Sequence, residues 1–348
     1  MAITNIDDLL HAPVEMLLDV IQERQPRSNS IMNSGLILST GERNYADRAL
    51  QDGAVSVQIP IISPVEGGYT GQNPGTPPVP DNITSGRQEA PVVYREKAWG
   101  RDAFSAAMSG LDPLTYIIDR VLNVRLDGAE DMWLANLDGI FASADFASLI
   151  LDTDVNEDPV NVAGDNVFFD ADIFHDLTGI LGINEDDLIG GTMIVHPKVR
   201  TKLKKIDETD FVPASKSQGI PFDTYKGIRL VVDNRAVRAG TTSGFVYPVT
   251  IAAPRSTILN IAKQSSDGTT SSSLAYDSDV PNLMKALYDR IVMIAHVNGT
   301  VWTPTGPAPD LTIAKCGPTD AQLATADAWT TAYTDVLNTR IVRAYANA

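Results

Sequence analysis

The most informative stretch of this sequence for the fold is Val55-Ser56-Val57-Gln58-Ile59-Pro60-Ile61-Ile62-Ser63-Pro64. Apolar residues alternate with Ser56, Gln58 and Pro60, which is the period of a strand with one buried face. Pro60 has no backbone N–H to donate, so the pattern predicts a strand at the edge of a sheet.

A long connection without a hydrophobic pattern follows at 67–86, before a second strand-like run at Glu89–Trp99. It exceeds the roughly 12–15 residues usual for a structureless connection inside a compact domain. A lone two-stranded hairpin is marginal in water, so the apolar side of this finger needs a second layer. Another copy of the protein could supply that layer; packing on the parent subunit is the alternative.

Composition limits the class of protein. The 348 residues are 43% apolar, enough for a sizeable core. With 27 basic against 44 acidic residues, the formal charge of −17 repels phosphate, so sequence-specific nucleic-acid binding is not expected. No apolar run of membrane-spanning length and no signal peptide is present. A single cysteine, Cys316, fits synthesis in a reducing cytoplasm.

The longest helical pattern covers Asp112–Phe141, with apolar residues at helical spacing from Ile117 to Phe141. Asp112 and Pro113 suit an N-cap and a first helical position. At 1.5 Å per residue the helix would be ~45 Å long, and Gly128 could mark a bend in it.

Shorter elements surround this helix. The sequence predicts an N-terminal amphipathic helix within residues 4–23, serving its own core or laid on a neighbour, and an α/β region at 165–262. Within that region we expect helices at Asp170–Gly182 and Lys198–Ile206 and strands at Thr192–His196, Ile228–Val232 and Tyr247–Ala252. A long strand at Asp289–Trp302, a helical segment near Ala321–Leu337 and a strand at Arg340–Tyr345 complete the prediction.

The search for catalytic chemistry finds no phosphate loop, dinucleotide fingerprint, nucleophile elbow or zinc motif. Two acidic groups resemble metal sites: Asp152, Asp154, Asn156 and Asp158, and Asp170, Asp172, His175 and Asp176. The first lacks the glycine and the bidentate glutamate of a calcium loop. The second suits a helix start, where carboxylates complement the dipole. We therefore expect no catalytic residue, no cofactor and no metal site, and interpret His196 and His296 as core residues.

The order of these elements resembles the tailed-bacteriophage major capsid proteins of the Hong Kong phage type. AVSVQIPIISPVEGG and EKAWGRDAFSAAMSG resemble the extended loop and the entry to the spine helix, and DRVLNVRLDGAEDMWLANLDGIFAS resembles that helix. GGTMIVHPKVRTKLKK, GIPFDTYKGIRLVVDN and VYPVTIAAPRSTI resemble the axial domain, and PTDAQLATADAWTTAYTDVLNTRIVRAYAN the closing segment. The similarity covers the chain from about residue 30.

The resemblance implies an α+β fold divided into six parts. They are an N-terminal arm (1–49), an extended loop (50–100), the spine helix with the start of the peripheral domain (101–150), the axial domain (151–275), peripheral strands (276–308) and a C-terminal segment (309–348).

The same resemblance implies a non-enzymatic structural protein. Its finger would lie across the adjacent copy, which would supply the missing layer for the predicted contact residues Val57, Ile59, Ile61 and Tyr94. Its copies would form pentamers and hexamers of an icosahedral virion head around double-stranded DNA, assembled in the host bacterial cytoplasm without a membrane. Scaffold, portal and decoration proteins are possible further partners. Some relatives cross-link lysine to asparagine; Lys97, the lysine of the finger, lies near its base, so no cross-link is expected here. The alternatives are an encapsulin-like nanocompartment shell and a metal-assisted hydrolase using Asp170, Asp172 and His175.

Overall fold

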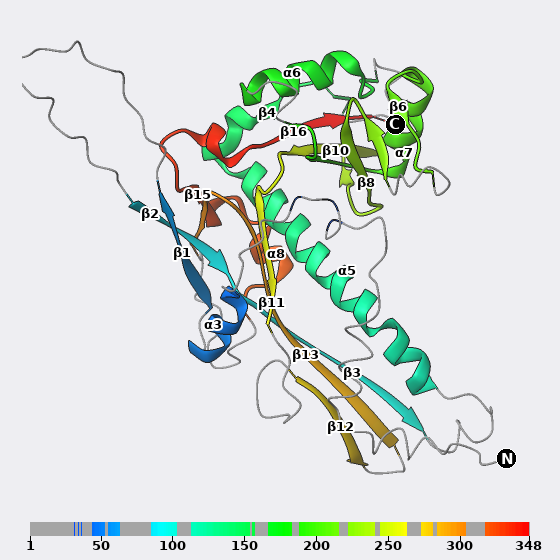
Figure 1. The fold of residues 1–348 in the computed structure, drawn as a ribbon, viewed down its shortest axis with the longest axis vertical. Coiled ribbons are helices and arrows are strands. Elements are labelled where there is room, and N and C mark those ends of the chain that lie inside the picture. The colour runs from blue at the N-terminus through cyan, green and yellow to red at the C-terminus, as the bar shows by residue number, and fades with distance from the viewer. Residues whose placement is uncertain are drawn as a thin grey trace, which may run out of the picture.

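The computed structural model describes residues 31, 34, 36, 44–52, 55–62, 85–102, 113–153, 155–156, 166–182, 188–215, 222–240, 244–262, 273–280, 284–303 and 317–347. Figure 1 shows an elongated arrangement, with a compact module at one end and a long helix and a sheet leading away from it. The helix predicted within 4–23 and most of the connection at 67–86 lie outside the described residues. No helix among the described residues is long and apolar enough to cross a membrane.

The long helix is confirmed. Helix α5 runs unbroken for 30 residues from Pro113 to Ala142, through Gly128. Asp112, the predicted N-cap, lies outside the described residues. The helix buries a stripe of large side chains: Met132, Trp133, Leu137, Ile140 and Phe141. This stripe follows from the helical spacing of the apolar residues.

A sheet centred on one long strand packs beside α5. Strand β13 (Met284–Val297) pairs antiparallel with β3 (Val93–Asp102), β12 (Ser273–Val280) and β11 (Thr257–Ile261). The predicted single strand at 289–302 is wrong, because β13 ends at Val297 and β14 (Thr300–Trp302) begins after a turn. The turn contains Asn298 and Gly299, and Gly299 has a φ of 86°. An Asn-Gly pair is a strong turn signal that the strand pattern concealed.

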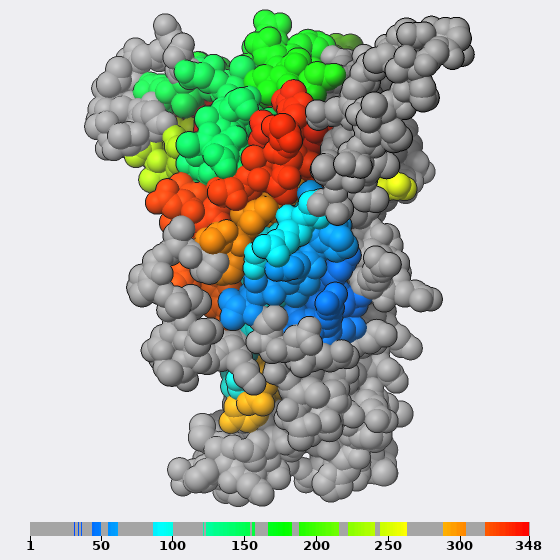
Figure 2. All heavy atoms as spheres, turned by 90° about the vertical axis from the view of Figure 1, so that its left-hand side faces the viewer, coloured from blue at the N-terminus to red at the C-terminus, as the bar shows by residue number. Residues whose placement is uncertain are grey.

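The finger forms a second sheet, in the order β1, β2, β14, β15. Strand β1 (Ser56–Ile62) pairs antiparallel with β2 (Ser85–Pro91), and β15 (Trp329–Thr331) closes the other edge. The edge position predicted from Pro60 is confirmed. The return strand is shorter than predicted, because residues from Val93 onward belong to β3 of the other sheet. Helix α3 (Tyr45–Asp52) lies beside β1 and β2 on one face of the molecule (Figure 2).

The compact module at the top of Figure 1 is the predicted α/β region, here called the axial module. Its sheet has the order β4, β16, β10, β5, β8, β7, β6, with β9 paired to β10. The strand bounds are β4 Ile150–Leu151, β5 Thr192–Val195, β6 Phe211–Val212, β7 Asp223–Tyr225, β8 Ile228–Val232, β9 Arg238–Ala239, β10 Phe245–Ala252 and β16 Ile341–Ala346.

Two helices of the module follow their sequence signals closely. Helix α6 (Ala171–Leu181) begins at Asp170, whose side chain accepts from the Ile173 N–H at 3.0 Å, and ends at Gly182 in the left-handed region. Helix α7 (Pro197–Ile206) begins after His196, whose Nδ1 accepts from the Lys198 N–H at 3.2 Å. His196 is therefore a cap rather than a core residue.

The module sheet lies between helices. Helices α6 and α5 are on opposite sides of β16 and β10 in Figure 1. Thr250 of β10 and Arg343 of β16 face α5, where they line a cavity beside that helix. Tyr247, three residues along β10 and therefore on the other face, contacts Lys198 of α7. The sheet thus joins the α5 side of the molecule to an outer α6 and α7 layer.

The helical prediction at Ala321–Leu337 is wrong. Helix α8 is only Asp320–Leu323, begun by a Thr319–Gln322 capping box, and 3-10 turns follow at Ala326–Ala328 and Val336–Thr339 around β15. Trp329 instead inserts beside α5, where its Nε1 donates to the Leu323 carbonyl at 2.7 Å. This tertiary contact overrides the local alanine-rich helix propensity.

The predicted division into six parts remains a prediction, but two strands cross its boundaries. Strand β11, within the range assigned to the axial domain, pairs with β13 of the long sheet. Strand β16, within the range assigned to the C-terminal segment, is an interior strand of the axial module between β4 and β10. Sequence position therefore does not separate the two sheets cleanly.

Candidate functional site

The finger has a buried and an exposed face, as its alternation predicts. Val57, Ile59 and Ile61 are only 6%, 3% and 8% exposed, whereas Gln58 and Pro60 are exposed. Gly86 lies opposite Ile61, where a Cβ would come within 3.3 Å of the isoleucine side chain. The small residue leaves room for the larger one, so the inner face is closely packed.

The layer under this face comes from the same chain. Val57 and Ile59 belong to a core cluster built from three other parts of the chain: Ala46 and Ala49 of α3, Ile258 of β11, and Val292 and Ile294 of β13. For Val57 and Ile59, the alternative of packing on the parent subunit is therefore the one that the structure shows. The supporting strand lies more than 200 residues away in sequence, where no local pattern connects it to the finger.

Tyr94 lies on β3, opposite Val292, and packs against the same cluster from outside the hairpin. Its ring is half-buried and its hydroxyl donates to the Ala49 carbonyl at 3.3 Å. Burial raises the pKa of this hydroxyl above its ordinary value. Their own chain already covers all four predicted contact residues, Val57, Ile59, Ile61 and Tyr94, wholly or partly. Contact of these side chains with a neighbouring copy stays a prediction.

The hairpin is fixed to the body by Gln88, a residue that the sequence analysis did not single out. Gln88 is 1% exposed on β2. Its Oε1 accepts from the Gly299 N–H at 2.6 Å, and its Nε2 donates to Asn298 Oδ1 at 3.0 Å. A Cβ at Gly299 would overlap the Tyr333 ring, so this position of the β13–β14 turn requires glycine. The signal available in the sequence was a polar residue next to the second strand-like run, because a polar side chain that becomes buried needs a hydrogen-bond partner.

The outer edge of β1 is open along the described residues. The Val92 N–H donates to the Val55 carbonyl at 2.8 Å, which identifies this pair as hydrogen-bonded. In an antiparallel ladder such pairs alternate, so the backbone groups of Gln58 and Pro60 point away from β2. The missing N–H of Pro60 therefore falls on the open edge, where it limits pairing with another strand.

A buried ion pair locks α5 to the long sheet. Arg125 Nη2 and Nε approach the two carboxylate oxygens of Asp289 on β13 at 2.7 and 3.0 Å. Both side chains are nearly inaccessible, at 8% and 5% exposure. A bidentate pair of this kind has a defined geometry and holds the helix at one position along β13.

Arg235 ties the axial module to α5. It follows β8 and forms ion pairs with Asp233 at 2.5 Å and with Glu130 and Asp131 of α5 at 2.8 and 2.6 Å. The Asp233 hydrogen bond, followed by the charges of Asp233 and Asp131, raises the pKa of this guanidinium above its ordinary value. One cation thus bridges three carboxylates across the joint.

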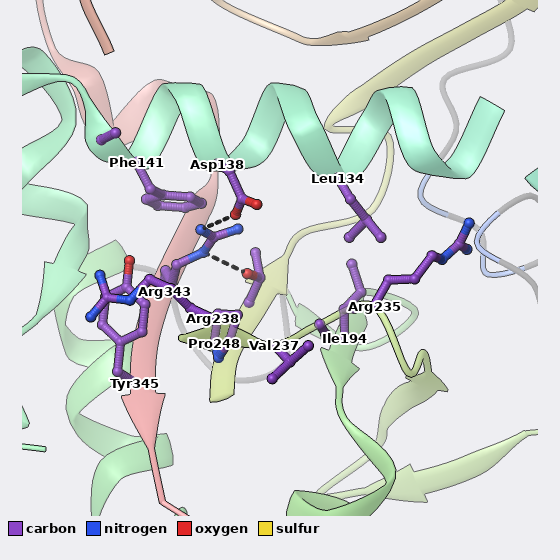
Figure 3. A pocket seen from close by; sticks show the side chains of 13 residues that line it. Leu134, Asp138, Phe141, Ile194, Arg235, Val237, Arg238, Pro248, Arg343 and Tyr345 are labelled. Atoms are coloured by element: carbon purple, nitrogen blue, oxygen red, sulfur yellow. Dashed lines mark hydrogen bonds and ion pairs between the residues drawn. The ribbon is translucent and has the colours of Figure 1, made fainter. Parts of the chain in front are cut away.

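A cavity of about 250 Å³ lies beside this joint, between α5 and the module sheet (Figure 3). Its wall contains Arg343, 4% exposed in its side chain, which pairs with Asp138 at 2.8 Å and donates from Nε to Thr250 Oγ1 at 3.1 Å. The Arg343 guanidinium also lies 4.4 Å from the centre of the Phe141 ring. The cavity therefore has an apolar floor and a satisfied cationic wall.

Among the described residues, the acidic group on α6 does not form a metal site. No group of three or more metal-binding side chains is found among the described residues. Asp170 caps α6, and His175 Nε2 lies 2.9 Å from Lys226 Nζ, an ammonium that disfavours a bound cation. Asp154 and Asp158 of the other group lie outside the described residues.

The sequence is similar to that of a known capsid protein, although no family model matches the chain. The major capsid protein of Bacillus phage SPP1 is 26% identical over 234 residues, 67% of this chain and 68% of that protein.

Two solved structures are similar to the chain in fold. The capsid of Ralstonia phage GP4 has a TM-score of 0.57 at 10% identity, covering 78% of this chain and 87% of the other. The cyanophage Pam1 capsid has a TM-score of 0.51 at 11% identity, covering 85% of both. Their low identity means that they show the α+β capsid fold alone.

Proposed function

We propose that this chain, which is a major capsid protein of a tailed-phage head, closes the icosahedral head as pentamers and hexamers around double-stranded DNA. Membership of this family makes it a structural, non-enzymatic protein of the virion capsid that self-assembles into a shell. The observation that carries the finer proposal is the finger, whose edge strand β1 faces outward from the body. A net charge of −17 suits a wall that encloses DNA without binding its sequence.

The finger then contacts the adjacent copy through its outer parts. These are the open edge of β1, the exposed side chains of Gln58 and Pro60, and the segment 63–84 that β1 and β2 carry. Val57, Ile59, Ile61 and Tyr94 serve this contact from within, because their packing holds the hairpin in one orientation. Many modest contacts of this type, repeated by symmetry, are sufficient for a stable shell.

The decisive experiment replaces residues 63–84 with a short glycine-serine linker. The last β1–β2 pair, Ile62 with Ser85, is kept, so the inner packing and the Gln88 anchor are preserved. We expect a folded subunit that no longer yields stable closed shells. Electron microscopy of the particles and circular dichroism of the subunit measure the two properties separately.

A scrambled version of 63–84, with the same composition and length, is the matched control for loop-closure entropy. Normal particles from the linker variant would contradict the role of the finger in shell closure. The same proposal includes assembly in the bacterial cytoplasm and contact with scaffold, portal or decoration proteins. Identification of the proteins that co-purify with the particles tests these contacts.

A further inference from the structure

Helix α7 carries an unusual concentration of cations for an acidic chain. Five of its ten residues are basic, out of 27 basic residues in the whole protein. Arg200 forms an ion pair with Asp223, but the structure shows no ion pair for the four lysines among the residues that it describes. The four are Lys198, Lys202, Lys204 and Lys205. All except Lys202 are exposed.

Local contacts account for only part of this pattern. Lys198 lies over the Tyr247 ring and donates to its hydroxyl at 3.0 Å, and Lys202 lies 3.9 Å from the centre of the Phe168 ring. Lys204 and Lys205 occupy the last turn, where cations suit the helix dipole. Lys198 is in the first turn, where a cation opposes the dipole, so the dipole alone does not explain a basic helix.

Helix α6 presents the opposite charge on the same layer. Asp172 and Asp176 are exposed and stand four residues apart, on one face of the helix. Neither has an ion pair within the described part of the chain. Asp170, by contrast, is occupied as the cap. Asp176 lies beyond the first turn, where the dipole no longer favours a carboxylate.

The two charged helices lie at different places on the module. Figure 1 shows α6 along the top of the axial module and α7 at its right-hand end, both away from the main length of α5. A ring of identical subunits uses two different patches of each subunit, so that one patch meets the other on the next copy. An acidic patch and a basic patch on one module satisfy this requirement.

We propose that the lysine face of α7 in one copy binds the Asp172 and Asp176 face of α6 in the next copy around each capsomer. This contact rests on the proposed function, since it needs copies arranged in rings. The complementary charges guide encounter and register more than they add affinity. Exposed ion pairs are individually weak, so the contact strengthens as salt is lowered.

Nucleic acid is a poorer fit to the lysines. Glu208 and Asp210 lie two and four residues beyond the end of α7 at Ile206, and both are exposed. These two carboxylates would repel a phosphate backbone that approaches the helix. The copy that presents α6 instead offers carboxylates in a short row, matched to the short row of lysines.

The test is a charge-reversal cycle in the full-length chain. Two variants, Lys204→Glu/Lys205→Glu and Asp172→Lys/Asp176→Lys, each place like charges across the contact. At about 0.1 M salt, where charges act over roughly 10 Å, we expect each to lower the yield of closed shells by about tenfold. The variant that combines all four changes restores complementarity and the natural net charge, and should recover most of the yield.

Three controls separate the explanations. Lys204→Gln/Lys205→Gln removes the attraction without adding repulsion and should give an intermediate yield, which keeps the contact testable even if the reversed helix folds poorly. Asp145→Lys/Asp327→Lys alters two exposed aspartates elsewhere by the same charge and should leave the yield unchanged. Thermal melting of unassembled subunits shows whether any variant fails to fold.

The outcomes distinguish this contact from the proposed function. Full shell yield from both reversed variants overturns the contact but leaves self-assembly intact. Normal shells that retain less DNA in Lys204→Glu/Lys205→Glu overturn it in favour of a phosphate-binding role. Failure of the combined variant to recover, when it folds normally, also overturns it. Absence of shells from the natural chain would count against the proposed function instead.

Discussion

The axial module and the finger reach a buried core by different routes. The module takes nearly all of its strands from residues 188–252 and adds only β4 and β16 from elsewhere. The finger rests on α3, β11 and β13, and its anchor Gln88 reaches a turn 210 residues away. The module core therefore rests mainly on contacts within one stretch of sequence, whereas the core under the finger depends on strands that are remote in sequence. The following predictions test this dependence.

Removing Arg125 should have the largest effect. Arg125→Ala leaves the buried Asp289 carboxylate without its bidentate partner, and we expect a loss of about 3–5 kcal/mol in the free energy of unfolding. Urea denaturation of unassembled subunits measures it. The double variant Arg125→Met/Asp289→Leu, which removes both charges, should recover much of the loss. If the single variant were as stable as the natural chain, the pair would not be holding the sheet and α5 together.

Truncation of the inner face of the finger should come next. Ile59→Ala removes methyl groups from the cluster of α3 and β13, and should cost about 2–4 kcal/mol of subunit stability before any assembly. Gln58→Ala on the exposed face is the matched control, expected to stay within about 0.5 kcal/mol. Equal stability of both variants in the unassembled subunit would mean that the inner face is completed only by a neighbour.

Acidification should weaken the long sheet through His296. This residue of β13 is fully buried, and burial lowers its pKa from 6.5 to about 3. The folded state therefore resists a proton that the unfolded state accepts, so stability is full above pH 6.5 and falls as the pH drops towards 3. At pH 5 the loss is about 2 kcal/mol relative to pH 7.

Urea denaturation at pH 7 and pH 5 measures this loss, and His296→Phe should remove most of it. His196, whose pKa burial also lowers, is half-exposed, so His196→Asn should change the pH dependence less. An unchanged pH profile in His296→Phe would show that other groups control the acid response.

The smallest effect on folding is expected at Pro60. Pro60→Val supplies the missing N–H on the open edge of β1 and should change subunit stability by less than about 1 kcal/mol. It should nevertheless increase irregular association, detected by light scattering at concentrations where the natural chain stays dispersed. Pro248→Val is not a suitable control because that proline is buried inside the module. Gln58→Val, which adds apolar surface without a new donor, is the better one.

Local sequence signals predicted local structure well. The stripe on α5, the Asp170 cap and Gly182 end of α6, and the edge position of Pro60 all follow from physics within a few residues. The helix at 321–337 failed because Trp329 gains more by inserting beside Gly139 than the alanines gain in a helix.

The partners of the finger could not be predicted in the same way. The alternation identified which side chains are buried but not what covers them, since β13 is remote in sequence. Arg235 and Arg343 carry no pattern that separates them from surface arginines. Only the fold places each of them against carboxylates of α5.

Strand β13 has a consequence beyond packing. Its odd-numbered residues Met293, Ala295 and Val297 lie in the core that contains α5, while Val292 and Ile294 lie in the core under the finger. A slip of one residue in its pairing would exchange the two sets, presenting each core with side chains sized for the other. Asp289 has the same parity as the α5 set, so a slip of one residue would also turn it away from Arg125. The ion pair therefore favours the native register of β13 over its nearest alternatives.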